Sequence, residues 1–138
     1  MKTLKEYLKI ESALKMTLND SQIKQIKMLQ KTITDKDMKP LPTKDLHITL
    51  VDGNEWKSVR NEYKGKELKD IDFNITFEKP KRIEGPNGRA SYYIKIIQQK
   101  QMNDYVKELV GVTNKGRVYH ASIANKTGKA GDSVREVK

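Results

Sequence analysis

The chain has 138 residues, a formal net charge of +10 and no cysteine. This length predicts a single domain, and the absence of cysteine excludes disulfides, thiol nucleophiles and cysteine-based zinc sites. No apolar run approaches the length of a membrane span, and residues 1–6 lack the apolar stretch of a secretory signal, so we expect a cytoplasmic protein.

The positive charge comes mostly from lysines scattered along the chain, without an arginine-rich arm. A basic surface attracts polyanions, which favours nucleic acid, cyclic nucleotides or other phosphate esters as partners. The same lysines would also suit a surface that is merely well solvated. Their scatter argues against a dedicated reader of duplex DNA, and we expect no membrane partner. The sequence leaves the oligomeric state open.

Hydrophobic periodicity predicts both helices and strands in the first half of the chain. In chain order these are a short helix over 2–10, a strand over 13–18, a helix over 20–32 capped at 19–21, and a strand over 46–51. Pro40 and Pro42 predict a loop before the strand over 46–51.

The second half begins with the clearest alternation of apolar and polar residues, which predicts a strand over 71–77. A turn at 85–88 follows, then a strand over 90–97, a helix over 100–110 and a strand over 117–124. In the strand over 90–97, Tyr93 and Lys95 share one face. The polar, glycine-containing segment 125–138 is expected to form a flexible tail or a flap.

Only two histidines occur, and both begin the same four-residue pattern, His47-Ile48-Thr49-Leu50 and His120-Ala121-Ser122-Ile123. Side chains alternate between faces along a strand, so each histidine shares a face with the hydroxyl two residues later. Imidazole titrates near neutral pH, and a hydroxyl can donate to a phosphate oxygen. Two such pairs brought together predict acid–base chemistry on a phosphate, with His47, Thr49, His120 and Ser122 as the catalytic residues.

Each motif closes a strand–helix–strand unit, one within 13–51 and the other within 90–124. Lys15 and Lys95 occupy similar places in the first strands of the two units. This order predicts a diverged internal duplication, although chance similarity also fits a single sequence. We therefore expect an α+β fold of two pseudo-symmetric lobes, with antiparallel sheets and outer helices around a central cleft, forming one domain over 1–138.

These features resemble the two-histidine phosphoesterase superfamily, the LigT-like proteins. Their hallmark is two His-x-Thr/Ser-aliphatic motifs on strands of two pseudo-symmetric lobes, and the resemblance covers about residues 12–124. It implies metal-independent cleavage of phosphodiester bonds without a cofactor. One histidine would be the general base and the other the general acid, while Thr49 and Ser122 would hold the non-bridging oxygens.

The short, lysine-rich, cysteine-free chain also resembles a small phage-encoded group of that superfamily, the anti-CBASS nucleases. This implies cleavage of 3′–5′ bonds in cyclic di- and trinucleotide immune signals, as phage counter-defence in the cytoplasm of the host cell. One alternative is a phosphodiesterase for RNA ends, 2′,3′-cyclic phosphates or 2′–5′ linkages. Another is a non-catalytic nucleotide- or RNA-binding module.

Four further residues are candidates for substrate binding, namely Tyr7, Lys15, Trp56 and Lys95. The two lysines could meet phosphates, although solvated lysines fit the pattern too. Tyr7 and Trp56 could stack on bases, and Tyr7 at helical spacing also fits a core residue. No cluster of histidines and carboxylates predicts a metal site, and no Gly-x-Ser-x-Gly elbow predicts a serine hydrolase.

Overall fold

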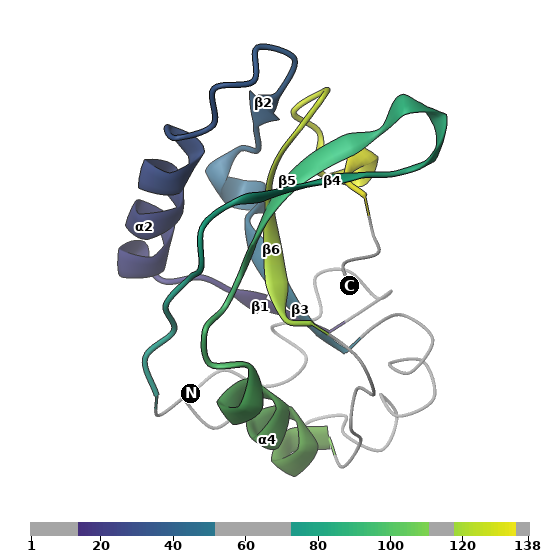
Figure 1. Cartoon of the computed structure of the whole chain (residues 1–138). Coiled ribbons are helices and arrows are strands. Elements are labelled where there is room, and N and C mark those ends of the chain that lie inside the picture. Colours follow the sequence, from purple (N-terminus) through teal and green to yellow (C-terminus); the bar gives the residue numbers. More distant parts are fainter. Residues whose placement is uncertain (1–13, 52–72, 111–117, 135–138) are drawn as a thin grey trace.

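The computed structural model describes residues 14–51, 73–110 and 118–134, and Figure 1 shows how their helices and strands are arranged. Their elements are β1 (Leu14–Thr17), α2 (Asp20–Gln30), β2 (Lys39–Pro40), β3 (His47–Val51), β4 (Lys81–Glu84), β5 (Ala90–Lys95), α4 (Gln99–Val110) and β6 (His120–Asn125). Short 3₁₀ turns lie at Thr43–Asp45, Pro86–Gly88 and Ala130–Asp132. The helix predicted over 2–10 lies outside the described residues.

The described strands form two antiparallel sheets, one with the order β1-β3 and one with the order β2-β6-β5-β4. The two sheets meet where β3 contacts β6, and Figure 1 shows these strands side by side. The two motif strands are therefore neighbours although they belong to different sheets. The predicted α+β class and the antiparallel pairing are confirmed.

The chain that leads into β3 is attached to β6. Pro40 in β2 lies opposite Ala124, and the Leu41 N–H donates to the Ile123 carbonyl at 2.9 Å. The predicted loop at Pro40 is therefore wrong, because this proline takes part in a short strand. It is tolerated there because β2 is an edge strand of its sheet, where a missing N–H costs no ladder bond.

Helix α2 begins where the sequence predicts it. The Asn19 side chain accepts from the Gln22 N–H at 2.9 Å, and the Gln22 side chain accepts from the Asn19 N–H at 2.9 Å. This capping box satisfies two donors that the first turn of a helix leaves without partners. Neither helix in the described part of the chain is long and apolar enough to cross a membrane.

One hydrophobic core joins both sheets and both helices. Its members include the apolar residues of the two motifs and one face of each helix, namely Ile26, Ile48, Leu50, Met102, Val106, Ala121 and Ile123. Because the helices and the apolar motif residues share this core, α2 and α4 cover the face of the motif strands opposite the histidines. The hydroxyl and imidazole side chains point away from the core.

The prediction of a strand over 71–77 is wrong for its described part, 73–77. Only Phe77 forms a strand-like bridge, with Ile96, and the Thr76 N–H donates instead to the Gln98 side chain at 2.9 Å. The alternation in sequence reflects burial, since Ile75 is buried and its apolar neighbours at 73 and 77 are half-buried. Burial of one face does not require a continuous ladder of backbone hydrogen bonds.

Strand β4 was not predicted, because Ile83 is its one apolar residue. It forms by pairing with β5 through the turn at Pro86–Gly88, where Asn87 has φ 60° and Gly88 has φ 73°. Asparagine and glycine are the residues that best tolerate this left-handed conformation. The turn predicted at 85–88 is confirmed.

The segment after β6 folds back onto the sheet as far as Val134. The fully buried Asn125 donates from its side chain to the Lys129 carbonyl at 2.6 Å and to the Ser133 hydroxyl at 3.0 Å. The Val134 N–H donates to the buried Ser91 hydroxyl at 2.7 Å. The expected tail or flap over 125–138 therefore begins with ten residues that are built into the fold through backbone and side-chain hydrogen bonds, at 125–134.

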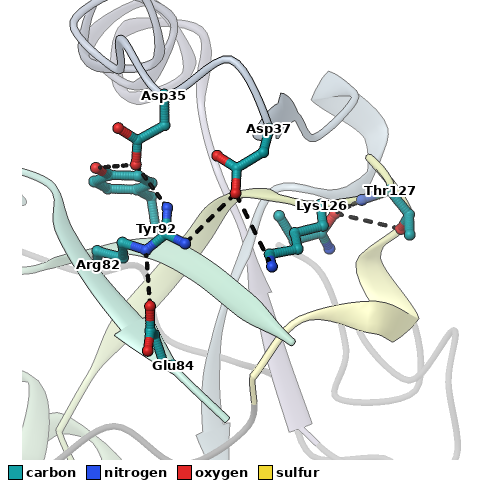
Figure 2. Close-up of polar contacts among 8 residues, drawn as sticks. Asp35, Asp37, Arg82, Glu84, Tyr92, Lys126 and Thr127 are labelled. Atoms are coloured by element: carbon teal, nitrogen blue, oxygen red, sulfur yellow. Dashed lines mark hydrogen bonds and ion pairs between the residues drawn. The ribbon is translucent and has the colours of Figure 1, made fainter. Parts of the chain in front are cut away.

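Arg82 on β4 ties the loop after α2 to the second sheet, as Figure 2 shows. Its guanidinium lies 2.7 Å from the Asp35 carboxylate and 3.5 Å from the Asp37 carboxylate. On its own strand it lies 3.4 Å from Glu84. These groups are partly exposed, so the cluster orients the loop more than it stabilises the fold.

Candidate active site

The two motif strands have matching burial patterns. On β3, His47 and Thr49 are half-buried while Ile48 and Leu50 are buried. On β6, His120 and Ser122 are half-buried while the residues between and after them are buried. The predicted alternation is confirmed on both strands. Because β3 contacts β6 and their apolar faces share one core, the two histidine–hydroxyl faces lie on the same side of the molecule.

Both imidazoles make the same backbone hydrogen bond. Nδ1 of His47 lies 2.9 Å from the Asp45 carbonyl oxygen, and Nδ1 of His120 lies 2.9 Å from the Val118 carbonyl oxygen. Each carbonyl belongs to the residue two positions earlier. A carbonyl only accepts, so Nδ1 carries the hydrogen in both rings, and Nε2 of the neutral ring holds the lone pair. Each Nε2 can thus accept a proton when the ring is neutral and donate one when it is charged.

The environment of His47 favours its neutral form. Burial lowers the pKa of His47, and the positive charge of Lys15 lowers it further. The hydrogen bond to the Asp45 carbonyl and the charge of the Asp45 carboxylate oppose this shift without overcoming it. His47 is therefore neutral in a larger fraction of molecules near pH 7 than an exposed histidine is.

Strand pairing determines which residues lie beside each motif. Lys15 of β1 lies opposite Thr49 of β3, whereas Lys95 of β5 lies opposite His120 of β6. The two lysines are therefore not in equivalent places, contrary to the comparison of their strands in sequence. By register the partner of Ser122 is Tyr93, so Tyr93 occupies the place that Lys15 has beside the first motif.

Both motif strands contain one extra residue relative to their partner strands, Leu50 on β3 and Ile123 on β6. The pairing of β1 shifts between Leu14 and Lys15, and that of β5 shifts between Tyr92 and Tyr93. In each case the shift comes directly before the residue opposite the motif hydroxyl. A β-bulge redirects side chains and is common beside active sites. Lys15 and Lys95 are half-buried on the strands that flank the two motif strands.

Tyr93 lies beside the candidate site, and the sequence did not indicate this contact. Its ring contacts that of His120 edge to face, with ring centroids 5.8 Å apart and ring planes at 78°. The available signal was the alternation that places Tyr93 and Lys95 on one face. The pairing partner of that face comes only from the fold.

Glutamine side chains bond the backbone just before the second motif and at its last residue. Gln99, the first residue of α4, donates to the Tyr119 carbonyl at 2.7 Å and accepts from the Tyr119 N–H at 2.9 Å. Gln30, the last residue of α2, donates to the Ile123 carbonyl at 2.9 Å. These contacts fix the backbone on which His120 lies, and no sequence pattern indicated them.

Two candidate residues, Tyr7 and Trp56, lie outside the described residues. The remaining six lie on β1, β3, β5 and β6, namely Lys15, His47, Thr49, Lys95, His120 and Ser122. Within 14–51, 73–110 and 118–134, no three histidine, aspartate or glutamate side chains gather as metal ligands would.

Comparison with protein-family models, with curated proteins and with solved structures finds no match to this chain. The class that the fold itself defines is a small α+β protein of two antiparallel sheets and two helices in its described part. Its candidate site is the common face of the two motif strands.

Proposed function

We propose that this protein is a metal-independent phosphodiesterase of the two-histidine type. The proposal depends on one observation, that His47 and His120 have the same position on their strands and the same backbone hydrogen bond. Both lie on neighbouring strands, point away from one shared core, and donate from Nδ1 to the carbonyl two residues earlier. Two imidazoles that present Nε2 in the same way are suited to accept and donate protons in one reaction.

In the proposed reaction, Nε2 of neutral His47 takes the proton from the attacking hydroxyl or water. Charged His120 gives a proton to the leaving oxygen as its bond to phosphorus breaks. The lowered pKa of His47 supports the base role in this step. The Thr49 and Ser122 hydroxyls donate to the non-bridging oxygens, where negative charge grows. If a 2′-hydroxyl is the nucleophile, a 2′,3′-cyclic phosphate forms, and water opens it with the two histidines in exchanged roles.

The proposal includes two pseudo-symmetric lobes around a cleft, within one domain over 1–138. Two correspondences support the symmetry. Apart from the short strand β2 between α2 and β3, the order β1, α2, β3 corresponds to the order β5, α4, β6, with a motif on the last strand of each set. In each set the motif strand contains one extra residue relative to the first strand, directly after the motif hydroxyl.

The proposed substrate is a cyclic di- or trinucleotide immune signal, cleaved at a 3′–5′ bond as phage counter-defence in the host cytoplasm. The net charge of +10 and the half-buried Lys15 and Lys95 beside the motifs suit a substrate with several phosphates. Tyr7 and Trp56 remain the predicted stacking residues. A phosphodiesterase for RNA ends, 2′,3′-cyclic phosphates or 2′–5′ linkages would use the same four catalytic residues. A non-catalytic nucleotide- or RNA-binding module would bind its ligand on the same face of the motif strands without cleaving it.

The deciding experiment incubates the protein in EDTA with cyclic di- and trinucleotides, 2′,3′-cyclic mononucleotides, 2′–5′ oligoadenylates and linear RNA, and identifies the products. His47→Ala and His120→Ala should each lower kcat by about 10²–10⁴-fold with much of the ligand affinity retained. Thr49→Ala and Ser122→Ala should lower it by about 10²–10³-fold. Thr32→Ala, which removes an exposed hydroxyl beyond α2, is the matched control.

The products of this experiment distinguish the proposed function from its two alternatives. Products from cyclic oligonucleotides support the full proposal, and products from only one of the other substrates move the assignment to that class. Binding without any product favours the binding module. Activity that EDTA abolishes and a divalent metal restores would contradict the metal-free reaction.

A further inference from the structure

His120 is held from the side by an aromatic ring. Tyr93 lies diagonally across from it on β5, two residues before Lys95, which is the direct partner of His120. The two rings meet edge to face at a centroid distance of 5.8 Å, and Tyr93 is 7% exposed. Aromatic pairs favour this geometry. A buried ring that packs against the imidazole limits the orientations that the imidazole can adopt.

His120 is also held from behind, through its backbone. The Gln99 side chain bonds both the N–H and the carbonyl of Tyr119, the residue directly before His120. It also donates to the Ile96 carbonyl at 2.9 Å, so one amide joins β6 to the end of β5. The three hydrogen bonds of the Gln99 side chain thus extend the connection between β5 and β6 beyond their last residue pair, Lys95 and His120.

We propose that Tyr93 and Gln99 are positioning residues for His120. Gln99 sets the path of the backbone from which His120 projects, and the Tyr93 ring sets the plane of the imidazole. The hydrogen bond from Nδ1 to the Val118 carbonyl then directs Nε2 away from the backbone. The inference rests on the proposed function, because it assigns these residues to the delivery of the proton from His120.

The chain offers a matched control for Tyr93 in the preceding residue. Tyr92 is also a tyrosine of β5, but its hydroxyl bonds Asp35, away from the histidines. Tyr93→Leu should lower kcat by about 10- to 100-fold with a smaller change in KM, because displacement of a catalytic group acts mainly on the chemical step. Tyr93→Phe should keep kcat within about threefold, and so should Tyr92→Leu.

Gln99 has a control of the same kind. The Gln98 side chain bonds a different segment of the chain: it accepts from the Thr76 N–H and donates to the Thr76 hydroxyl. Gln99→Ala should lower kcat by about tenfold, whereas Gln98→Ala should leave kcat unchanged at a similar loss of thermal stability. Equal losses of kcat in both variants would show a general structural effect and would overturn the role of Gln99.

A second measurement does not depend on turnover. The chain has only two histidines, so proton–carbon NMR spectra contain two sets of imidazole signals, which His47→Asn assigns. Tyr93→Leu removes the ring current and should move the His120 signals while those of His47 stay in place. Tyr93→Phe should leave both sets unchanged.

The results distinguish a failure of the proposed function from a failure of the positioning role of Tyr93 and Gln99. If no phosphodiester is cleaved but Tyr93→Leu moves only the His120 signals, the ring contact holds and the proposed function fails. If cleavage occurs and Tyr93→Leu changes neither kcat nor the His120 signals, the positioning role fails. A loss in Tyr93→Phe as large as that in Tyr93→Leu would assign the effect to the hydroxyl and overturn the role of the ring. If Tyr93→Leu does not fold, Tyr93→Phe and the two glutamine variants still decide.

Discussion

Asp35, in the loop after α2, accepts a 2.8 Å hydrogen bond from the Tyr92 hydroxyl on β5. The same carboxylate oxygen lies 2.7 Å from the Arg82 guanidinium on β4, as Figure 2 shows. The hydrogen bond from Tyr92 is the largest cause of a lowered pKa for Asp35, and the bond from Arg82 adds to it. The ionised Asp35 carboxylate therefore joins the loop after α2 to the β4–β5 hairpin.

Asp35→Asn should lower the stability of the protein by a small amount at neutral pH, because its ion pair is partly exposed, and by less in acid. A carboxyl whose pKa is lower in the folded state stabilises the fold above its unfolded pKa, near 3.8, and this contribution decreases as the pH falls from that value towards the lower folded pKa. Urea midpoints of wild type and variant at about pH 7 and about pH 3 measure the difference. Asp104→Asn, which removes an exposed carboxylate from α4, is the control. A gap of equal size at both pH values would contradict the prediction.

His47 should make the protein less stable in mild acid. Its pKa is lower in the folded state, so between the unfolded value near 6.5 and the folded value the unfolded chain binds more protons. Stability therefore falls as the pH drops below about 6.5. In His47→Asn, urea midpoints should change less between about pH 7 and pH 5 than in wild type. The expectation fails if the two proteins lose stability in parallel.

Lys15→Gln should raise the pKa of His47 towards its ordinary value, because it removes a positive charge that disfavours the imidazolium. NMR titration of the two histidines measures this directly. If His47 is the base, the acid limb of the pH–rate profile should move to higher pH in the same variant. Lys95→Gln is the matched control, since Lys95 pairs with His120 rather than with the first motif. An unmoved His47 titration in Lys15→Gln would contradict the electrostatic role of Lys15.

Substitutions at two adjacent residues of the first motif should separate effects on stability from effects on catalysis. Ile48 is fully buried, so Ile48→Ala should lower the free energy of unfolding by about 2–5 kcal/mol. Thr49 is half-buried on the opposite face, and Thr49→Ala should lower kcat far more than stability. Urea denaturation and steady-state kinetics on both variants test the division. A Thr49→Ala variant that is fully active on the wild-type substrate would exclude its role with the phosphate.

Much of the candidate site could be predicted because the relevant signal is local. The histidine and the hydroxyl of each motif are two residues apart, and the period of a strand alone places them on one face. Likewise, Asn19 and Gln22 form the capping box at a spacing that the helix geometry imposes. These features need only the residues of one segment. The confirmed alternation in β3 and β6 follows from the same local rule.

The features that could not be predicted depend on segments far apart in the chain. Strand β4 has no apolar pattern of its own and exists because β5 pairs with it. In the reverse case, residues 73–77 alternate well but pair at a single bridge, because the Gln98 side chain takes the Thr76 N–H. A periodic pattern reports which face is buried and does not report which backbone lies beside it.

The sequence by itself determined that two imidazole–hydroxyl pairs lie on strand faces opposite a hydrophobic core, because hydropathy and the strand period are properties of short segments. Only the tertiary structure decided which side chains lie beside those pairs. The register and the two bulges place Lys15 opposite Thr49 and Tyr93 opposite Ser122, and a glutamine from α4 fixes the start of β6. Register depends on contacts between distant segments, and a shift of one residue would reverse every face.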